Sequence, residues 1–341
     1  MRSTLRRFAL GMLATAVFAT AAEAQISYPC VNDAPNPYRA VRNWSETPRA
    51  WWSPLGAAVD SKNDLWVFDR CEVAGCTDSK ASPIFHLGPD GKTKANIGAG
   101  LFVFPHGIAA DRDGNVWAVD GDIKDGKGNQ VFKLGPDGRI LMALGKAGQG
   151  KGSKALDVFD QPTAVAVASN GDVFVAEGHA PSFGNSRIVK FDRNGKFIRT
   201  FGRLGSGEGE LKEPHAIALD SQDRLFVADR RNSRVAIFDR DGKFLAAWKQ
   251  FGRPSGLAIG NDVLYTIDSQ SSDMPGANYN PGCKPGIRVG SVRDGKVTAF
   301  IPPPPTADGK FVPPEGIAAD LNGTIYAVAQ EGNDVIKLVK N

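Results

Sequence analysis

The sequence predicts an all-β protein with the architecture of a six-bladed β-propeller. The composition, 42% hydrophobic and 23% charged among 341 residues, is typical of a globular chain. A unit made of a proline, a small-residue apolar strand, a Gly/Asp/Asn turn and a second apolar strand occurs six times. Two further short strands follow within a copy. Four strands in each repeat of about 40–60 residues are typical of an antiparallel propeller blade.

The second copy, PHGIAADRDGNVWAVDG, shows the pattern clearly, with its third strand in QVFKLGPDG and its fourth in ILMALG. The six copies begin at Pro54, Pro105, Pro162, Pro214, Pro254 and Pro314. The last copy stops at Asn341 after its third strand, which would leave an unpaired blade edge. Residues 38–44 are predicted to supply the missing strand, so that residues 38–341 form a single propeller whose last blade is closed by an N-terminal strand.

Residues 1–24 are typical of a secretory signal peptide. Three arginines precede an apolar run over residues 8–22, and small residues flank a cleavage site after Ala24. Residues 25–37, in which Pro and Asn are frequent, are expected to form a leader. The apolar run is too short to span a bilayer, so we expect a periplasmic or secreted protein without an integral membrane segment. A formal charge of +4 without a basic cluster argues against nucleic-acid binding.

Four cysteines in an exported chain favour disulfides, because the compartment is oxidising. Cys71 and Cys76 would close a short loop, which leaves Cys30 to pair with Cys283 by elimination. The other pairings, and a zinc site built on Cys71 and Cys76, are the less favoured alternatives.

The repeat places one residue of each copy at the same position, directly after the initiating proline. Since the first strand of a blade lines the central channel, these six residues should lie near the axis. They are Leu55, His106, Thr163, His215, Ser255 and Glu315. His106, His215 and Glu315 fall on alternate blades and converge on one axial point, as a catalytic metal site with three protein ligands requires. Zinc is expected and iron or another divalent ion is the alternative. The competing interpretation is that these histidines bind water or neighbouring loops.

The loops after the second strands should surround the same point, because the second strand returns to the face where the first begins. Arg70 and Arg230 lie there, each directly after an aspartate, and His179 follows the third blade's second strand. The two arginines could bind a substrate carboxylate or carbonyl oxygen. A salt bridge between each arginine and the preceding aspartate is the alternative. We expect the acidic segment 120–126 to be a solvated turn rather than a calcium loop, and His86 to be an ordinary packed or surface side chain.

The repeats resemble NHL repeats. Residues 54–341 resemble the catalytic core of the peptidyl-α-hydroxyglycine α-amidating lyases, most closely in LFVFPHGIAADRDGNVWAVD and EPHAIALDSQDRLFVADRRNSRV. The resemblance implies a six-bladed propeller with zinc on its axis, held by three histidines, and with two arginines and a tyrosine around the metal. It also implies cleavage of a carbinolamide C–N bond to an amide and glyoxylate.

Residue by residue, the resemblance assigns two zinc ligands to His106 and His215 and the two active-site arginines to Arg70 and Arg230. The third histidine is replaced by Glu315 in Pro-Glu-Gly, which also lacks an acidic residue associated with a structural calcium, so calcium is not expected. The tyrosine is absent, and His179 stands in its place within a longer loop, where it could accept the substrate's proton.

The sequence therefore predicts a metal-dependent lyase that is monomeric and acts on a small-molecule or peptide substrate. Two alternatives belong to other classes. One is a non-enzymatic NHL propeller that binds a peptide, glycan or protein at the same rim. The other is a metal-assisted hydrolase of lactones or esters. Metal content separates the binding protein from the enzymes, and release of glyoxylate separates the lyase from the hydrolase.

Overall fold

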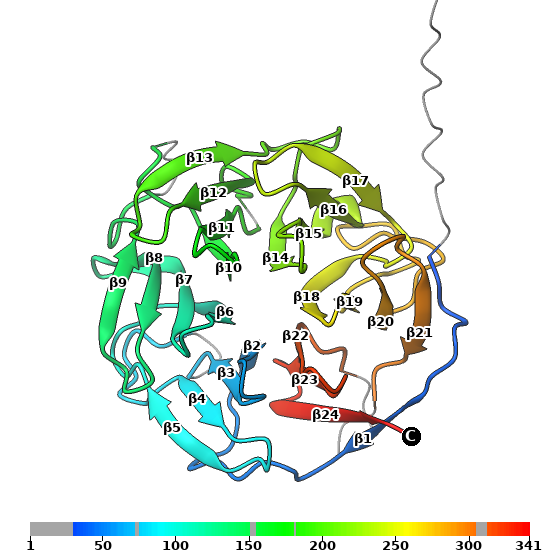
Figure 1. Cartoon of the computed structure of the whole chain (residues 1–341), viewed down its shortest axis with the longest axis horizontal. Helices are drawn as coiled ribbons and strands as arrows, with labels where there is room; N and C mark the ends of the chain where they lie inside the picture. The colour runs from blue at the N-terminus through cyan, green and yellow to red at the C-terminus, as the bar shows by residue number, and fades with distance from the viewer. Residues whose placement is uncertain (1–29, 72–74, 151–154, 181, 305–311) are drawn as a thin grey trace, which may run out of the picture.

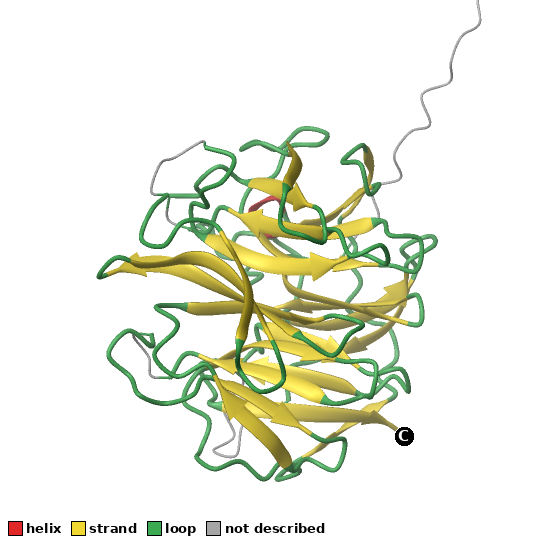
Figure 2. Cartoon of the chain, turned by 60° about the vertical axis from the view of Figure 1, so that its left-hand side comes forward, coloured by secondary structure: helices red, strands yellow, loops and turns green. Residues whose placement is uncertain are grey.

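Six four-stranded antiparallel sheets are arranged as blades around a central axis (Figure 1). The structure is a computed structural model and describes residues 30–71, 75–150, 155–180, 182–304 and 312–341. Apart from one 3-10 turn, η1 (Arg230–Asn232), the regular elements of this part are strands (Figure 2). The predicted fold class is confirmed.

Each blade begins at the axis and ends at the outer edge. The innermost strands are β2 (Pro54–Val59), β6 (Pro105–Ala110), β10 (Pro162–Val167), β14 (Pro214–Leu219), β18 (Pro254–Gly260) and β22 (Gly316–Ala319). The second strands are β3 (Leu65–Asp69), β7 (Val116–Lys124), β11 (Val173–Glu177), β15 (Leu225–Asp229), β19 (Val263–Asp268) and β23 (Ile325–Ala329).

The outer half of each blade contains the third and fourth strands. The third strands are β4 (Ile84–Leu87), β8 (Lys127–Leu134), β12 (Arg187–Phe191), β16 (Arg234–Phe238), β20 (Gly286–Ser291) and β24 (Asp334–Lys340). The fourth strands are β5 (Thr93–Ile97), β9 (Ile140–Leu144), β13 (Phe197–Phe201), β17 (Phe244–Trp248), β21 (Val297–Ile301) and β1 (Tyr38–Val41).

The N-terminal strand β1 closes the last blade, as the sequence predicts. It pairs antiparallel with β24, with Tyr38 opposite Lys340 (Figure 1). Residues 30–37, within the segment expected to be a leader, lie against blade five. The Arg288 guanidinium donates to the Val31 carbonyl at 2.6 Å, and Cys30 forms a disulfide with Cys283. Both predicted disulfides are present, and the expected signal peptide lies outside the described residues.

The hydrophobic core is divided into six clusters, each between two neighbouring blades. Between blades six and one, for example, Val67 and Phe85 pack with Tyr326 and Val328. Each blade is therefore apolar on both faces, which explains why the second strands are continuous buried runs rather than alternating ones. Among the described residues, no helix has the length and apolar character needed to cross a bilayer.

Candidate metal centre on the propeller axis

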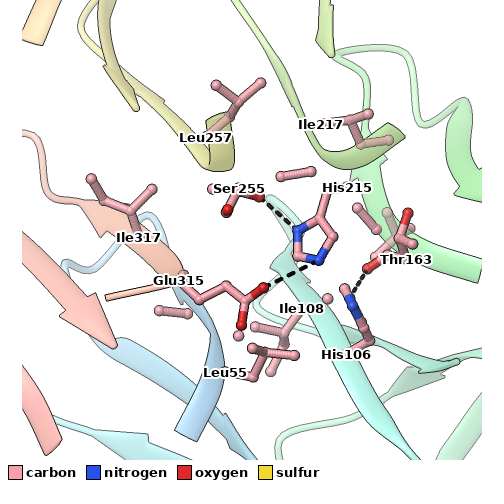
Figure 3. A pocket seen from close by; sticks show the side chains of 18 residues that line it. Leu55, His106, Ile108, Thr163, His215, Ile217, Ser255, Leu257, Glu315 and Ile317 are labelled. Carbon is pink, nitrogen blue, oxygen red and sulfur yellow. Dashed lines mark hydrogen bonds and ion pairs between the residues drawn. The ribbon is translucent and has the colours of Figure 1, made fainter. Parts of the chain in front are cut away.

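The six residues that follow the initiating prolines all line a cavity of about 70 Å³ on the axis (Figure 3). A β-bulge sets their direction in the second and fourth blades. Pairing shifts by one residue between Pro105 and Ile108, and again between Pro214 and Ile217. Bulges of this kind re-aim a side chain, and here they direct the intervening histidine toward the axis.

His106 and His215 are held in one tautomer by backbone carbonyls. The Nδ1 atom of His106 lies 2.7 Å from the Thr163 carbonyl oxygen, and that of His215 lies 2.8 Å from the Ser255 carbonyl oxygen (Figure 3). Because a carbonyl can only accept, both Nδ1 atoms carry the proton and both Nε2 atoms present a lone pair.

Both Nε2 atoms are buried, and neither has a hydrogen-bond partner in the described part of the chain. Burial, with the positive charge of nearby groups, keeps the pKa of each ring well below the ordinary value, so both are neutral. A buried acceptor without a partner costs free energy. Here two such Nε2 atoms are directed toward the axis, and the Nδ1 atom of each ring is bound to a backbone carbonyl. This is the arrangement of histidines that bind a metal.

A third imidazole, His179, lies beside the other two in the loop after β11. Its Nδ1 atom is 2.8 Å from the Ala180 carbonyl oxygen, so its Nε2 atom also presents a lone pair. The ring centroid of His179 lies 5.1 Å from that of His106 and 5.3 Å from that of His215. The potential ligand atoms of the three histidines lie within 4.8 Å of one another.

Glu315 lies next to His215 but is held by an arginine. Its Oε1 atom is 3.5 Å from Nε2 of His215 and 2.8 Å from Nη1 of Arg230 (Figure 3 shows the first of these contacts). Since His215 is neutral and unprotonated at Nε2, two acceptors face each other there. That arrangement is favourable only with a positive charge beside them, which Arg230 supplies from the Glu315 side.

Arg230 is bound by two carboxylates, neither of which is the aspartate that precedes it. Its Nη2 atom lies 2.6 Å from Oε1 of Glu213, and its Nη1 atom contacts Glu315. Asp229 pairs instead with Arg234, at 2.7 Å. Burial opposes ionisation of Glu213, but the hydrogen bond and charge of Arg230 outweigh it and lower the pKa of this carboxyl to about 2.

Arg70 reaches the same face of the propeller with no ion pair to any residue that the structure describes. Its Nε atom donates to the Pro105 carbonyl oxygen at 3.1 Å, and its guanidinium lies 3.8 Å from the centre of the Phe104 ring. Asp69 pairs with Arg49 instead. Burial lowers the pKa of Arg70 to about 10, so it remains a cation at neutral pH. The alternative pairing of each arginine with its preceding aspartate is therefore wrong.

Sequence reasoning missed Glu213, which connects the loop of blade three to blade four. Besides Arg230, it accepts the Ala180 backbone N–H at 3.1 Å and Nε of Arg231 at 2.9 Å. Its position directly before Pro214 and His215 could have indicated from the sequence that it lies near the axis. Sequence reasoning also missed a repeated role for the acidic residue that ends a second strand. Asp69 and Glu177, for instance, accept backbone N–H groups from the segment that enters the same blade.

The weaker candidates have structural partners. Segment 120–126 forms the end of β7 and the turn of the β7–β8 hairpin, and Asp120 is buried there, so the expectation of a solvated turn is wrong for this residue. His86, with Asp60 and Asp64, forms a second cluster of potential ligands. His86 stacks on Trp66 with ring centroids 3.9 Å apart, and Lys94 already neutralises Asp64 at 2.7 Å.

The NHL repeat family matches residues 211–238, which contain β14, β15 and His215. With six blades of four strands, the chain is an NHL-repeat β-propeller that resembles the amidating lyases. It is 33% identical over 315 residues to peptidyl-glycine alpha-amidating monooxygenase B of Xenopus laevis, covering 83% of this chain and 33% of that protein. It is 28% identical over 320 residues to peptidyl-alpha-hydroxyglycine alpha-amidating lyase 2 of Drosophila melanogaster, covering 86% and 72%. The chain thus spans about one third of the amphibian protein and most of the insect lyase.

Solved structures share the fold. Virginiamycin B lyase from Staphylococcus aureus superposes with a TM-score of 0.55 at 18% identity, covering 89% of this chain and 99% of that one. A gluconolactonase from Xanthomonas campestris superposes with a TM-score of 0.58 at 15% identity, covering 93% and 100%. At these identities the likeness concerns the six-bladed architecture alone.

Proposed function

We propose that this chain is a metal-dependent lyase that cleaves the C–N bond of an α-hydroxy-amide, releasing an amide and glyoxylate. The Nε2 atoms of His106 and His215 carry the proposal, because neither of these buried lone pairs has a hydrogen-bond donor among the described residues. The relatedness to proteins named as amidating lyases supports the choice of reaction. Zinc is the expected metal, since neutral imidazoles suit it, and iron is the alternative.

When bound, the metal supplies Lewis acidity that polarises the substrate's hydroxyl oxygen. The chain supplies orientation and charge. Arg70 donates Nε–H to the Pro105 carbonyl beside His106 and forms no ion pair with a described carboxylate, so its remaining donors can bind a carboxylate or carbonyl oxygen of the substrate. Arg230 is fixed between Glu213 and Glu315, which preorganises its charge for the transition state.

The reaction moves one proton from the α-hydroxyl to the departing amide nitrogen. The O–H bond breaks as the carbonyl of glyoxylate forms, and the electron pair of the broken C–N bond takes up the proton on nitrogen. Two side chains beside the axis can accept the hydroxyl proton. His179 is the one expected from the sequence, and Glu315 is the other. The same two residues compete for the third place on the metal.

The direct test is release of glyoxylate from a small N-acyl-α-hydroxyglycine by the purified, metal-loaded chain. We expect turnover that is lost in the His106→Ala and His215→Ala variants together with about one metal ion per chain. Full metal content in the double variant would refute the axial site. A metal-loaded parent that releases no glyoxylate but opens a lactone ring would establish the hydrolase instead. A parent that binds no metal would favour the binding propeller.

We also propose that the chain is exported through a signal peptide at residues 1–24. The two disulfides support this proposal, because such bonds persist in oxidising compartments. Mass spectrometry of the protein recovered from the producing cell's exported fraction should find an N-terminus at Gln25. An intact N-terminus in the cytosolic fraction would contradict it.

A further inference from the structure

We infer that His179, and not Glu315, is the third protein ligand of the metal at the axis, so that the ligand comes from a loop of blade three rather than from the repeat position in blade six. This inference rests on the metal site proposed above. It reverses the assignment made from the sequence, in which Glu315 was a ligand and His179 accepted a proton.

Convergence of the three imidazoles is the first reason. The potential ligand atoms of His106, His179 and His215 lie within 4.8 Å of one another. All three rings donate Nδ1–H to a carbonyl oxygen at 2.7–2.8 Å, and all three therefore present Nε2. The shared tautomer is what a set of neutral imidazole ligands requires.

The loop that carries His179 is anchored, which is the second reason. The His179 carbonyl accepts the Phe183 N–H at 2.8 Å, and Oε1 of Glu213 accepts the Ala180 N–H at 3.1 Å. The Phe183 ring lies 5.4 Å from the Arg231 guanidinium of blade four. These contacts place the imidazole before any ligand arrives, so that little ordering entropy opposes binding.

The position of Glu315 is the third reason. Its Oε1 atom is committed to Arg230 at 2.8 Å and lies 3.5 Å from Nε2 of His215. To become a ligand, this carboxylate would have to share its charge with the metal and weaken a partly buried ion pair. Three imidazoles meet no such competition.

Assigning His179 rather than Glu315 as the metal ligand also changes which residue accepts the proton of the substrate's hydroxyl group. With Nδ1 on the Ala180 carbonyl and Nε2 on the metal, His179 has no nitrogen left for the substrate. Glu315 then remains as the carboxylate beside the open side of the site. A neutral set of three histidines leaves the charge of the ion undiminished, which strengthens its Lewis acidity relative to a set that includes a carboxylate.

Metal content tests the inference without using activity. The parent, His179→Ala, Glu315→Gln and the control His86→Gln, which removes a histidine from the outer part of blade one, would be loaded with zinc, dialysed against a weak chelator and measured by elemental analysis. We expect about one ion per chain in the parent, Glu315→Gln and His86→Gln, and at least a tenfold loss of zinc affinity in His179→Ala. Zinc retained by His179→Ala and lost by Glu315→Gln would overturn the inference.

A spectroscopic variant keeps the test valid if His179→Ala folds poorly. His179→Cys loaded with cobalt(II) should show a thiolate-to-cobalt charge-transfer band in the near ultraviolet, whereas the cobalt-loaded parent should not. Cobalt bound without that band would refute coordination at residue 179. If the parent binds no zinc at all, the proposed function is wrong. If the parent binds zinc and releases glyoxylate, and the His179→Ala variant keeps its zinc, only the present inference is wrong.

Discussion

Arg70 and Arg230 occupy equivalent places in blades one and four, but their partners differ. Arg230 joins two carboxylates, Glu213 and Glu315, whereas Arg70 donates to a backbone carbonyl and lies on an aromatic ring. Removing a guanidinium therefore has different structural consequences at the two places. Loss of the Arg230 guanidinium leaves Glu315 without its arginine and leaves Glu213 with Arg231 alone, whereas loss of the Arg70 guanidinium breaks no described ion pair.

We predict that Arg70→Ala and Arg230→Ala each raise the barrier measured by kcat/KM by about 2 kcal/mol or more, the scale of a lost preorganised donor. Only Arg230→Ala should also lower the free energy of unfolding substantially, by about 3 kcal/mol, because Glu315 loses its arginine and the buried Glu213 keeps only Arg231. Steady-state kinetics and denaturant unfolding measure the two effects. Equal losses of stability in both variants would contradict the different partners.

Asp120 makes stability depend on pH in a defined direction. Burial raises the pKa of this carboxyl to about 7, despite backbone N–H donors from Val103 and Phe104. A carboxyl whose pKa is higher in the folded state than in the unfolded state binds more protons when folded, so stability falls as pH rises from about 4 to 7. Asp120→Asn should remove about 2 kcal/mol of that fall between pH 5 and pH 7, as measured by urea unfolding. Parallel pH profiles of the two proteins would disprove it.

At the scale of the element, the inner strands approach each other closely around the axis. A Cβ atom on Gly107 would lie 2.5 Å from the Thr163 carbonyl oxygen, which is also the acceptor for Nδ1 of His106. The glycine after the histidine is thus needed for close approach between blades two and three, and the same carbonyl orients His106, one of the proposed metal ligands.

Gly107→Ala should therefore destabilise the protein by about 2 kcal/mol and weaken metal binding, since the carbonyl must move. Gly260→Ala is the matched control, because a Cβ atom at that position in β18 meets its nearest atom at 3.4 Å. Thermal unfolding and zinc titration would be compared for both. If the melting temperature and the zinc affinity of Gly107→Ala equal those of the parent, the inner strands are not packed closely enough to exclude a Cβ atom at residue 107.

The Cys71–Cys76 disulfide braces the chain directly after Arg70. By the loop-entropy argument so short a loop contributes at most about 2–3 kcal/mol, so its larger effect should be on the orientation of Arg70. The Cys71→Ser/Cys76→Ser variant should have a lower kcat/KM and a small change in melting temperature. The Cys30→Ser/Cys283→Ser variant should have a clearly lower melting temperature and a nearly unchanged kcat/KM, because that bond ties the N-terminal segment to blade five. Identical behaviour of the two variants would reject this division of roles.

At the scale of the whole molecule, the ring is closed non-covalently by strand β1. Its pairing with β24 covers the outer edge of the last blade, and the cluster between blades six and one completes the apolar ring. Closure therefore joins the N-terminal strand β1 to the C-terminal strand β24.

Deleting residues 25–45 should abolish soluble folding, because it exposes the edge of β24 and removes the anchor at Cys30. The chain beginning at residue 25 is the control. Expression in soluble form and size-exclusion chromatography provide the measurement. A stable, monomeric shortened chain would show that closure is dispensable.

Much of the architecture could be predicted from local sequence patterns. The proline that opens each copy, the turn between its strands and the apolar runs predict blade number and strand order, since each is a property of neighbouring residues. The last copy has no fourth strand of its own, and the edge that this leaves unpaired predicts the role of residues 38–44. The position after the proline identifies His106, His215 and Glu315 as neighbours of the axis without any knowledge of their contacts.

What the sequence by itself determined is thus the propeller and the set of side chains that meet at its axis. Only the tertiary structure decided which partner each of those side chains contacts. Arg230 turns to Glu213 and Glu315, and His179 lies against two histidines from other blades, because contacts between blades set the conformation of the loops that carry them. The Ala180 N–H on Glu213 is such a contact, joining residues 33 positions apart. Repeat spacing specifies positions on strands, but an inserted loop takes its shape from the neighbour against which it packs.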